Sequence, residues 1–196
     1  MTSQAQTQVR GRFRDGGTDT IDTAPTWLAA ENTNHSLDVT DGNAKFRLRY
    51  MLQENSAASG NETWTIRSQK NGAGGYLAVT TSTLGCRSAD VSSSVDNAAL
   101  TVQRLTAGTG SFIAGQYDET GATAAAVISA SNHTEYEYGL ELVAAEVVDG
   151  DFFDFRIYRT TTALSVYTVT LRITTIKTAA SNIGMMTGSV MGPPYF

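Results

Sequence analysis

Residues 135–176 constrain the fold more than any other part of this chain. Residues 135–142 alternate between apolar side chains and acidic or small ones. Successive side chains of a strand point to opposite faces, so this period of two predicts a strand with one apolar and one acidic face. Similar runs cover residues 153–158 and 167–174. The Asp-Gly pair at 149–150 favours a tight hairpin between the first two runs, because Gly tolerates a positive φ.

The rest of the chain repeats this pattern between Gly- and Asn-rich turns. Further strands are expected at residues 46–52, 64–69, 76–79, 100–105, 111–117 and 124–130. No segment has a convincing amphipathic helical period, and residues 140–148 are interpreted as strand plus turn. The sequence therefore predicts an all-β fold, an antiparallel β-sandwich of jelly-roll type with about eight or nine strands and extended terminal arms.

Three segments are expected along the chain. Residues 1–36 lack a strong period and are interpreted as an extended N-terminal arm, residues 37–178 as the sandwich domain, and residues 179–196 as a Met-rich C-terminal arm. Either arm could dock on its own sandwich or on a neighbouring subunit. The residues expected to make such interfaces are the charged and apolar side chains of the two arms: Arg10, Arg12, Arg14, Trp27, Leu28, Met185, Met186, Met191, Tyr195 and Phe196.

Composition narrows the classes of partner. The 196 residues carry a formal net charge of −5, which argues against nucleic acid, since phosphate binding needs a basic surface. No apolar run approaches the length of about 18 residues expected of a membrane span. The N-terminus does not resemble a signal peptide. The single Cys86 cannot form an internal disulfide and is expected to be a buried or half-buried thiol.

No pattern in the sequence points to catalysis. His35 and His133 stand beside polar turn residues and are expected in solvated loops, and no zinc spacing, phosphate-binding loop or nucleophile motif is present. The carboxylates near residues 149–154 show no convergence of the glycosidase kind. The chain is therefore expected to be no enzyme and to hold no metal or cofactor.

An acidic stripe on the 135–142 strand has two interpretations. Glu135, Glu137 and Glu141 would usually form a solvated strand face. They could also pair with a basic stripe across strands or on a neighbouring subunit. The basic stripe consists of Arg47, Arg49 and Arg67.

Several segments together resemble a group of structural proteins of tailed bacteriophages. The segments are Trp27-Leu28-Ala-Ala-Glu, Phe46-Arg47-Leu48-Arg49-Tyr50, Gly108-Thr-Gly-Ser-Phe112-Ile-Ala-Gly115, Glu135 to Asp151 and Tyr167-Thr-Val-Thr-Leu-Arg-Ile-Thr174. The resemblance is one of pattern across most of residues 27–175, and no single motif is diagnostic. It implies a β-sandwich or jelly-roll component of the virion and offers no catalytic residues.

The expected function is that of a capsid decoration or cement protein. Such a protein would bind the major capsid protein or other virion subunits, form homo-oligomers with trimers favoured, and strap neighbouring capsomers with its arms. Its expected place is the virion, assembled in the host cytoplasm. The alternatives are a head-fibre, tail-fibre or spike module that binds host-surface glycan, and a ring subunit of the tail or connector.

Overall fold

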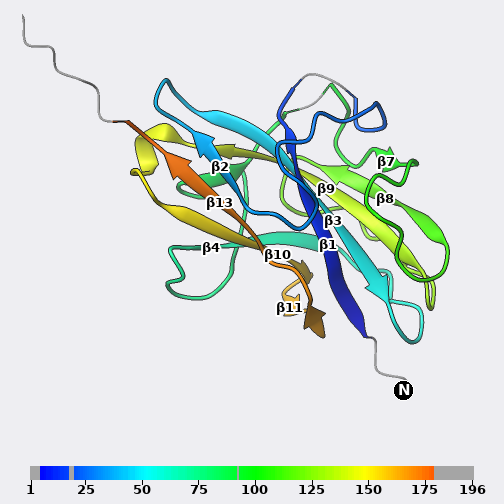
Figure 1. Cartoon of the computed structure of the whole chain (residues 1–196). Helices are drawn as coiled ribbons and strands as arrows, with labels where there is room; N and C mark the ends of the chain where they lie inside the picture. The colour runs from blue at the N-terminus through cyan, green and yellow to red at the C-terminus, as the bar shows by residue number, and fades with distance from the viewer. Residues whose placement is uncertain (1–4, 18–19, 92, 179–196) are drawn as a thin grey trace, which may run out of the picture.

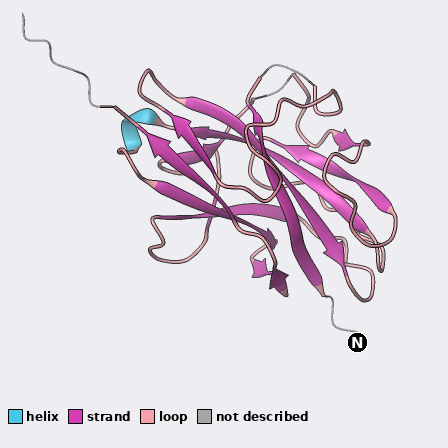
Figure 2. Ribbon diagram, viewed as in Figure 1, coloured by secondary structure: helices cyan, strands magenta, loops and turns pink. Residues whose placement is uncertain are grey.

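A computed structural model describes residues 5–17, 20–91 and 93–178. Over these residues the chain forms thirteen strands in two sheets that pack face to face (Figure 1). The described residues contain no α-helix, and the only helical turn among them is a 3-10 turn at Ala144–Glu146 (Figure 2). The predicted all-β, sandwich-like class is therefore confirmed.

Sheet A has seven strands and carries the longest pairings of the molecule. In spatial order they are β12 (Val166–Tyr167), β1 (Gln6–Asp15), β3 (Ala44–Glu54), β9 (His133–Leu142), β8 (Phe112–Asp118) and β7 (Ala99–Leu100), with β6 (Cys86–Ser88) also beside β9. Figure 1 shows β1, β3 and β9 side by side.

Sheet B has six strands. In spatial order they are β2 (His35–Asp38), β13 (Leu171–Ile176), β10 (Phe152–Arg159), β4 (Trp64–Lys70) and β5 (Leu77–Ala78), with β11 (Thr162–Ala163) also beside β10. Gly150 has a φ of 79° in the turn before β10, but the expected tight hairpin does not form, because β9 lies in sheet A and β10 in sheet B.

Both sheets are mixed, so a purely antiparallel arrangement is not what the chain adopts. Strands β1 and β12, β2 and β13, and β8 and β9 pair in parallel. A period of two shows which side chains share a face, but it carries no information on the direction of the neighbouring strand. The expected number of strands was also too small, because several strands have only two or three residues.

The predicted third run, residues 167–174, does not form one strand. Its beginning belongs to β12 in sheet A and its end to β13 in sheet B, so the chain crosses between the sheets at residues 168–170. The expected strand at residues 124–130 is reduced to an isolated bridge between Ala126 and Glu62. An alternating sequence therefore does not show where a strand is interrupted.

The N-terminal segment corrects the predicted domain boundary. Residues 6–15, expected in an extended arm, form β1, which pairs with β3 from Gln6–Glu54 to Asp15–Phe46 and with β12 on its other edge. Several of its buried side chains are polar, including Gln8 and Arg14, so the strand lacks the apolar alternation by which strands are recognised. The sandwich therefore begins well before residue 37.

The core lies between the two sheets. The apolar side chains of β9, from Tyr136 to Leu142, face those of β4, β10 and β13 across the layer. Trp64 and Tyr136 bring their ring centroids within 5.9 Å, and Phe46 and Phe155 within 6.1 Å. Both contacts join sheet A to sheet B, so the alternation along β9 directly specifies the packing of the sandwich.

The opposite face of sheet A is covered by the protein's own loops and holds a buried ionic layer. Glu137 is fully buried and forms ion pairs with Arg14, Arg47 and Arg49. Carbonyl oxygens of residues 20 and 21 accept hydrogen bonds from the guanidinium groups. The acidic stripe is therefore not a solvated face at Glu135 and Glu137. The alternative, pairing across strands, is confirmed for Arg47 and Arg49.

Candidate binding surface

The outer face of sheet B is partly exposed to solvent, whereas loops cover the outer face of sheet A. Every second residue of β10, from Phe152 through Asp154 and Arg156 to Tyr158, points away from the core and is half-buried. The intervening residues Phe153, Phe155 and Ile157 lie in the core. The alternation of side-chain direction along β10 therefore places a row of aromatic and charged groups on this surface.

Neighbouring strands extend this row with two more arginines. Arg67 of β4 lies directly opposite Arg156 in the ladder, and Arg172 of β13 lies opposite Asp154. Tyr76 precedes β5, and Tyr167 reaches the same surface from β12 at the edge of sheet A. We call this surface the arginine–tyrosine face, and its members are Arg67, Tyr76, Phe152, Arg156, Tyr158, Tyr167 and Arg172.

The guanidinium group of Arg156 lies between two tyrosine rings. Its central carbon is 4.5 Å from the ring centroid of Tyr76 and 4.5 Å from that of Tyr167. Arg67 stacks in the same way on Tyr158, at 4.7 Å. The ring of Tyr158 is in turn 6.3 Å from Tyr76 and 6.2 Å from Tyr167. Aromatic rings thus hold both cations in place, an arrangement worth about 0.5–2 kcal/mol per contact.

Arg172 differs from these two arginines because it has a carboxylate partner. Its Nε and NH2 groups donate to the two oxygens of Asp154 at 2.8 and 2.9 Å, and its guanidinium lies 3.8 Å from the ring centroid of Phe152. Such a bidentate ion pair fixes the planar guanidinium group of Arg172 in one orientation. Asp154 and Arg172 therefore neutralise one another.

Arg67 and Arg156 have few partners of their own. The side chain of Arg156 donates from Nε to Thr170 Oγ1 at 3.1 Å, and that of Arg67 donates from NH1 to the carbonyl oxygen of Tyr76 at 3.3 Å. Neither guanidinium forms an ion pair with a carboxylate of residues 5–17, 20–91 or 93–178. Two positive charges therefore lie opposite one another on a half-open surface.

The hydroxyls of Tyr76 and Tyr167 stay protonated over the whole neutral range. Burial raises the pKa of Tyr76, and the nearby Arg156 only partly opposes this effect. Burial also raises the pKa of Tyr167 to about 12. Tyr167 uses its hydroxyl internally, donating to the carbonyl oxygen of Ile157 at 2.9 Å. The hydroxyls of Tyr76 and Tyr158 form no hydrogen bond with the described part of the chain.

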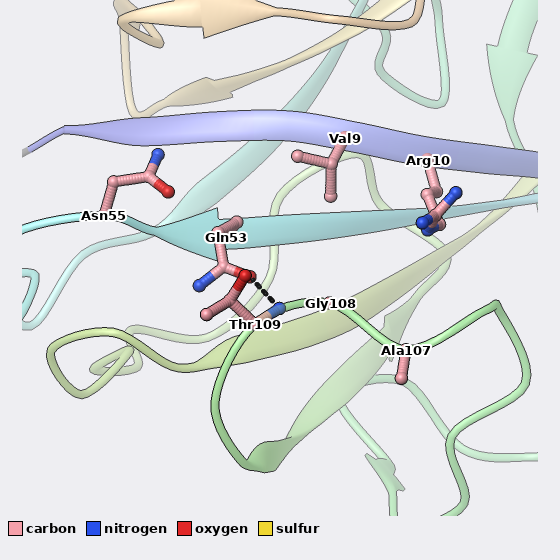
Figure 3. A pocket seen from close by; sticks show the side chains of 7 residues that line it. All are labelled: Val9, Arg10, Gln53, Asn55, Ala107, Gly108 and Thr109. Carbon is pink, nitrogen blue, oxygen red and sulfur yellow. Dashed lines mark hydrogen bonds between the residues drawn. The ribbon is translucent and has the colours of Figure 1, made fainter.

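A second surface feature is a depression of about 310 Å³ beside β1 (Figure 3). It lies between Val9, Arg10, Gln53 and Asn55 on one side and residues 107–109 on the other. Two of its polar side chains bond within the protein, since Gln53 Oε1 accepts from the Thr109 N–H at 2.8 Å and Arg10 pairs with Glu31 at 3.2 Å. The depression brings no pair of titratable groups together for chemistry.

The carboxylates of residues 149–154 that were considered for catalysis make hydrogen bonds within the fold. Asp151 accepts hydrogen bonds from Asn71 and from the Val148 N–H, and Asp149 accepts one from the Lys177 N–H. Within the described ranges, no group of three or more His, Cys, Asp or Glu side chains is placed to hold a metal ion. No helix of this part of the chain has the length and apolar character needed to cross a membrane.

Both histidines belong to strands, which corrects their expected place in solvated loops. His35 begins β2 and is half-buried, while His133 begins β9 and is 1% exposed. The ring nitrogens of His133 lie 3.0 Å from Thr109 O and 3.3 Å from Gln103 Oε1. Cys86 is fully buried, as predicted, and burial raises the pKa of its thiol.

The N-terminal residues predicted to form an interface are used within the chain. Arg14 has no exposed surface, so of the two predicted docking partners it contacts its own sandwich and not a neighbouring subunit. The guanidinium of Arg12 stacks on the Trp27 ring at 4.5 Å, and Leu28 packs against the core. Together with the Arg10–Glu31 pair, these contacts dock residues 20–32 onto β1. The C-terminal candidates Met185, Met186, Met191, Tyr195 and Phe196 lie outside the described residues.

Sequence reasoning missed the arginine–tyrosine face as a unit. The alternation in residues 153–158 did place Asp154, Arg156 and Tyr158 on one face. Tyr76 and Tyr167 come from segments 91 residues apart, and the topology alone brings both to Arg156. A local pattern contains no signal for such a meeting. Comparison of the chain with models of known protein families found no match, and comparison with curated proteins found none either.

Proposed function

We propose that this chain is a non-enzymatic virion structural protein that attaches to a neighbouring component through the arginine–tyrosine face. The observation that carries the attachment surface is the contrast between the two sheets. Loops and a buried ionic layer cover sheet A, while sheet B presents half-buried Arg and Tyr side chains. Tyr and Arg are enriched at protein interfaces and among the residues that dominate binding energy.

The virion assignment rests on the sequence resemblance to structural proteins of tailed phages. Within it, the first choice is a capsid decoration or cement protein that binds the major capsid protein as a homo-oligomer, with a trimer favoured. The jelly-roll relationship and the strap function of residues 179–196 belong to the same proposal. A subunit repeated by capsid symmetry must present one compact surface many times, and a rigid sandwich meets that need.

Quantitative mass spectrometry of purified particles tests this assignment. A decoration protein is expected in hundreds of copies per particle, whereas a fibre or connector subunit is expected in few. Particles that lack the chain altogether would overturn the virion assignment. Reattachment of purified wild-type and Arg156→Gln protein to stripped particles then tests the surface, and equal attachment of both would exclude the arginine–tyrosine face.

A second candidate function, a recognition module for host-surface glycan, is favoured by one specific observation. The arginine–tyrosine face combines guanidinium N–H donors with the tyrosine hydroxyls of Tyr76 and Tyr158, the groups by which proteins recognise sugar hydroxyls and acids. A glycan array probed with the labelled protein tests this candidate. Binding that is lost in Arg156→Gln supports it, and an array without signal counts against it.

A further inference from the structure

We infer that Arg67 and Arg156 form a binding site for the carboxylate or sulfate groups of an acidic polysaccharide. This inference rests on the second proposed function and adds the chemical class of the ligand. Its starting point is the register of sheet B, in which Arg67 and Arg156 are Cα partners on adjacent strands.

Two arginines directly opposite one another are unfavourable in an isolated sheet. Like charges at such positions destabilise the pair, and here no described carboxylate neutralises either one. The next tier along the strands, about 6.6 Å away, holds Arg172, whose charge is already balanced by Asp154. The Arg67–Arg156 pair therefore keeps two positive charges, on a protein whose formal net charge is −5.

The arrangement leaves donor groups available while fixing their position. Tyr76 and Tyr167 each place a ring centroid 4.5 Å from the central carbon of the Arg156 guanidinium, and these contacts hold that group in position. The Nε group is used by Thr170, which leaves the terminal N–H groups without an acceptor in the described chain. The edge of a guanidinium matches the two oxygens of a carboxylate or sulfate.

Arg67 adds a second donor group beside the first. It donates to the Tyr76 carbonyl through NH1, while its Nε is buried and has no hydrogen-bond partner among the described residues. A buried donor left without an acceptor destabilises the fold. An oxyanion held between the two guanidinium groups would offset the repulsion between them.

A saccharide fits the surroundings of this anion site. The hydroxyls of Tyr76 and Tyr158 flank the two arginines and are not bonded to the described chain, so they can exchange hydrogen bonds with sugar hydroxyls. The site lies on a sheet face between strands, which suits an extended chain carrying repeated acidic groups. A DNA strand fits less well, because its phosphodiester backbone carries no sugar hydroxyls for Tyr76 and Tyr158 to bind.

Titration calorimetry of the full chain with defined probes tests the inference. The probes are heparin for sulfate groups, polygalacturonate for carboxylate groups, neutral dextran, and a single-stranded DNA oligonucleotide. We expect binding of one or both acidic polysaccharides, weakening with added salt. Arg156→Gln and Arg67→Gln should each raise Kd about tenfold or more. The matched control is Lys45→Gln, an equal charge change at an exposed site of sheet A, expected to leave Kd within about twofold.

The conservative variant Arg156→Lys keeps the inference testable if Arg156→Gln fails to fold. Lysine retains the positive charge but cannot form the bidentate hydrogen bonds of a guanidinium group. A loss of affinity between those of wild type and Arg156→Gln therefore supports the site. Equal weakening by Lys45→Gln and Arg156→Gln would show unspecific attraction and overturn the inference, as would tighter binding of the oligonucleotide. Equal binding of dextran would overturn the anion site but leave glycan recognition standing. No binding of any saccharide would overturn both.

Discussion

The Nε group of Arg49 donates a 2.5 Å hydrogen bond to Glu137 Oε2, and neither side chain reaches solvent. The same carboxylate pairs with Arg14 at 3.1 Å and with Arg47 at 3.4 Å. The single negative charge of Glu137 therefore interacts with three arginines. Arg14 comes from β1, both other arginines from β3, and Glu137 from β9. This group therefore couples the three neighbouring strands of sheet A through charge as well as through their ladders.

Loss of the Glu137 charge should be costly for this reason. Glu137→Gln leaves the cationic groups of Arg14, Arg47 and Arg49 underbalanced in a buried site, and we expect the free energy of unfolding to fall by about 3–5 kcal/mol. Glu141→Gln is the matched control, since Glu141 lies on the same strand and pairs with the partly exposed Arg87. It should cost about 1 kcal/mol or less. Denaturant titrations measure both, and equal losses would contradict the role of the buried layer.

Deletion of residues 1–15 should abolish the cooperative thermal transition. It removes β1, exposes the edge of β3 along its whole length, and leaves Glu137 without Arg14. Deletion of residues 181–196 touches no described residue, and we expect it to leave the melting temperature of the sandwich nearly unchanged. Circular dichroism melts compare the two truncations. A folded protein without residues 1–15 would restore the interpretation of that segment as an arm.

Two glycines with positive φ should respond differently to alanine. Gly121 has a φ of 94°, and a Cβ there would lie 1.8 Å from the carbonyl oxygen of Val79. Gly150 has a φ of 79° but open space around a Cβ. Gly150→Ala should cost about 1–2 kcal/mol through backbone strain alone, and Gly121→Ala on the order of 3 kcal/mol or more because strain and overlap add. Unfolding free energies that rank the other way would contradict this description of the turns.

Asp151 should make the fold sensitive to acid. Burial acts to raise its pKa, but hydrogen bonds from Asn71 and Lys70 outweigh burial and hold the pKa below its ordinary value. The carboxylate therefore stabilises the fold above the unfolded pKa of about 3.9, and this contribution is lost as pH falls through the lower folded pKa. Asp151→Asn should melt lower than wild type near neutral pH, and the difference should shrink as the pH is lowered below the unfolded pKa of about 3.9. The exposed Asp41→Asn serves as control, and a constant difference at all pH values would contradict the linkage.

Some of this structure was determined by the sequence alone. The alternation of apolar and polar side chains in residues 46–52, 64–69, 135–142 and 153–158 predicted strands that β3, β4, β9 and β10 confirm. The Asp-Gly pair at 149–150 predicted the turn before β10 but not that the chain changes sheet there. These features depend on neighbours one or two residues apart, so a local pattern is sufficient to fix them.

Tertiary structure decided everything that depends on which strands meet. Gln6–Asp15 became an inner strand because Arg14 finds Glu137, 123 residues away, and no local pattern records that partner. The acidic face of β9 was buried because strands β1 and β3 supplied arginines and a loop brought carbonyl groups to them. Arg156 came to lie between Tyr76 and Tyr167 only through the pairing of distant segments. From sequence alone, a charged side chain is expected to be exposed to solvent. It is buried only where the fold brings oppositely charged or hydrogen-bonding partners to it.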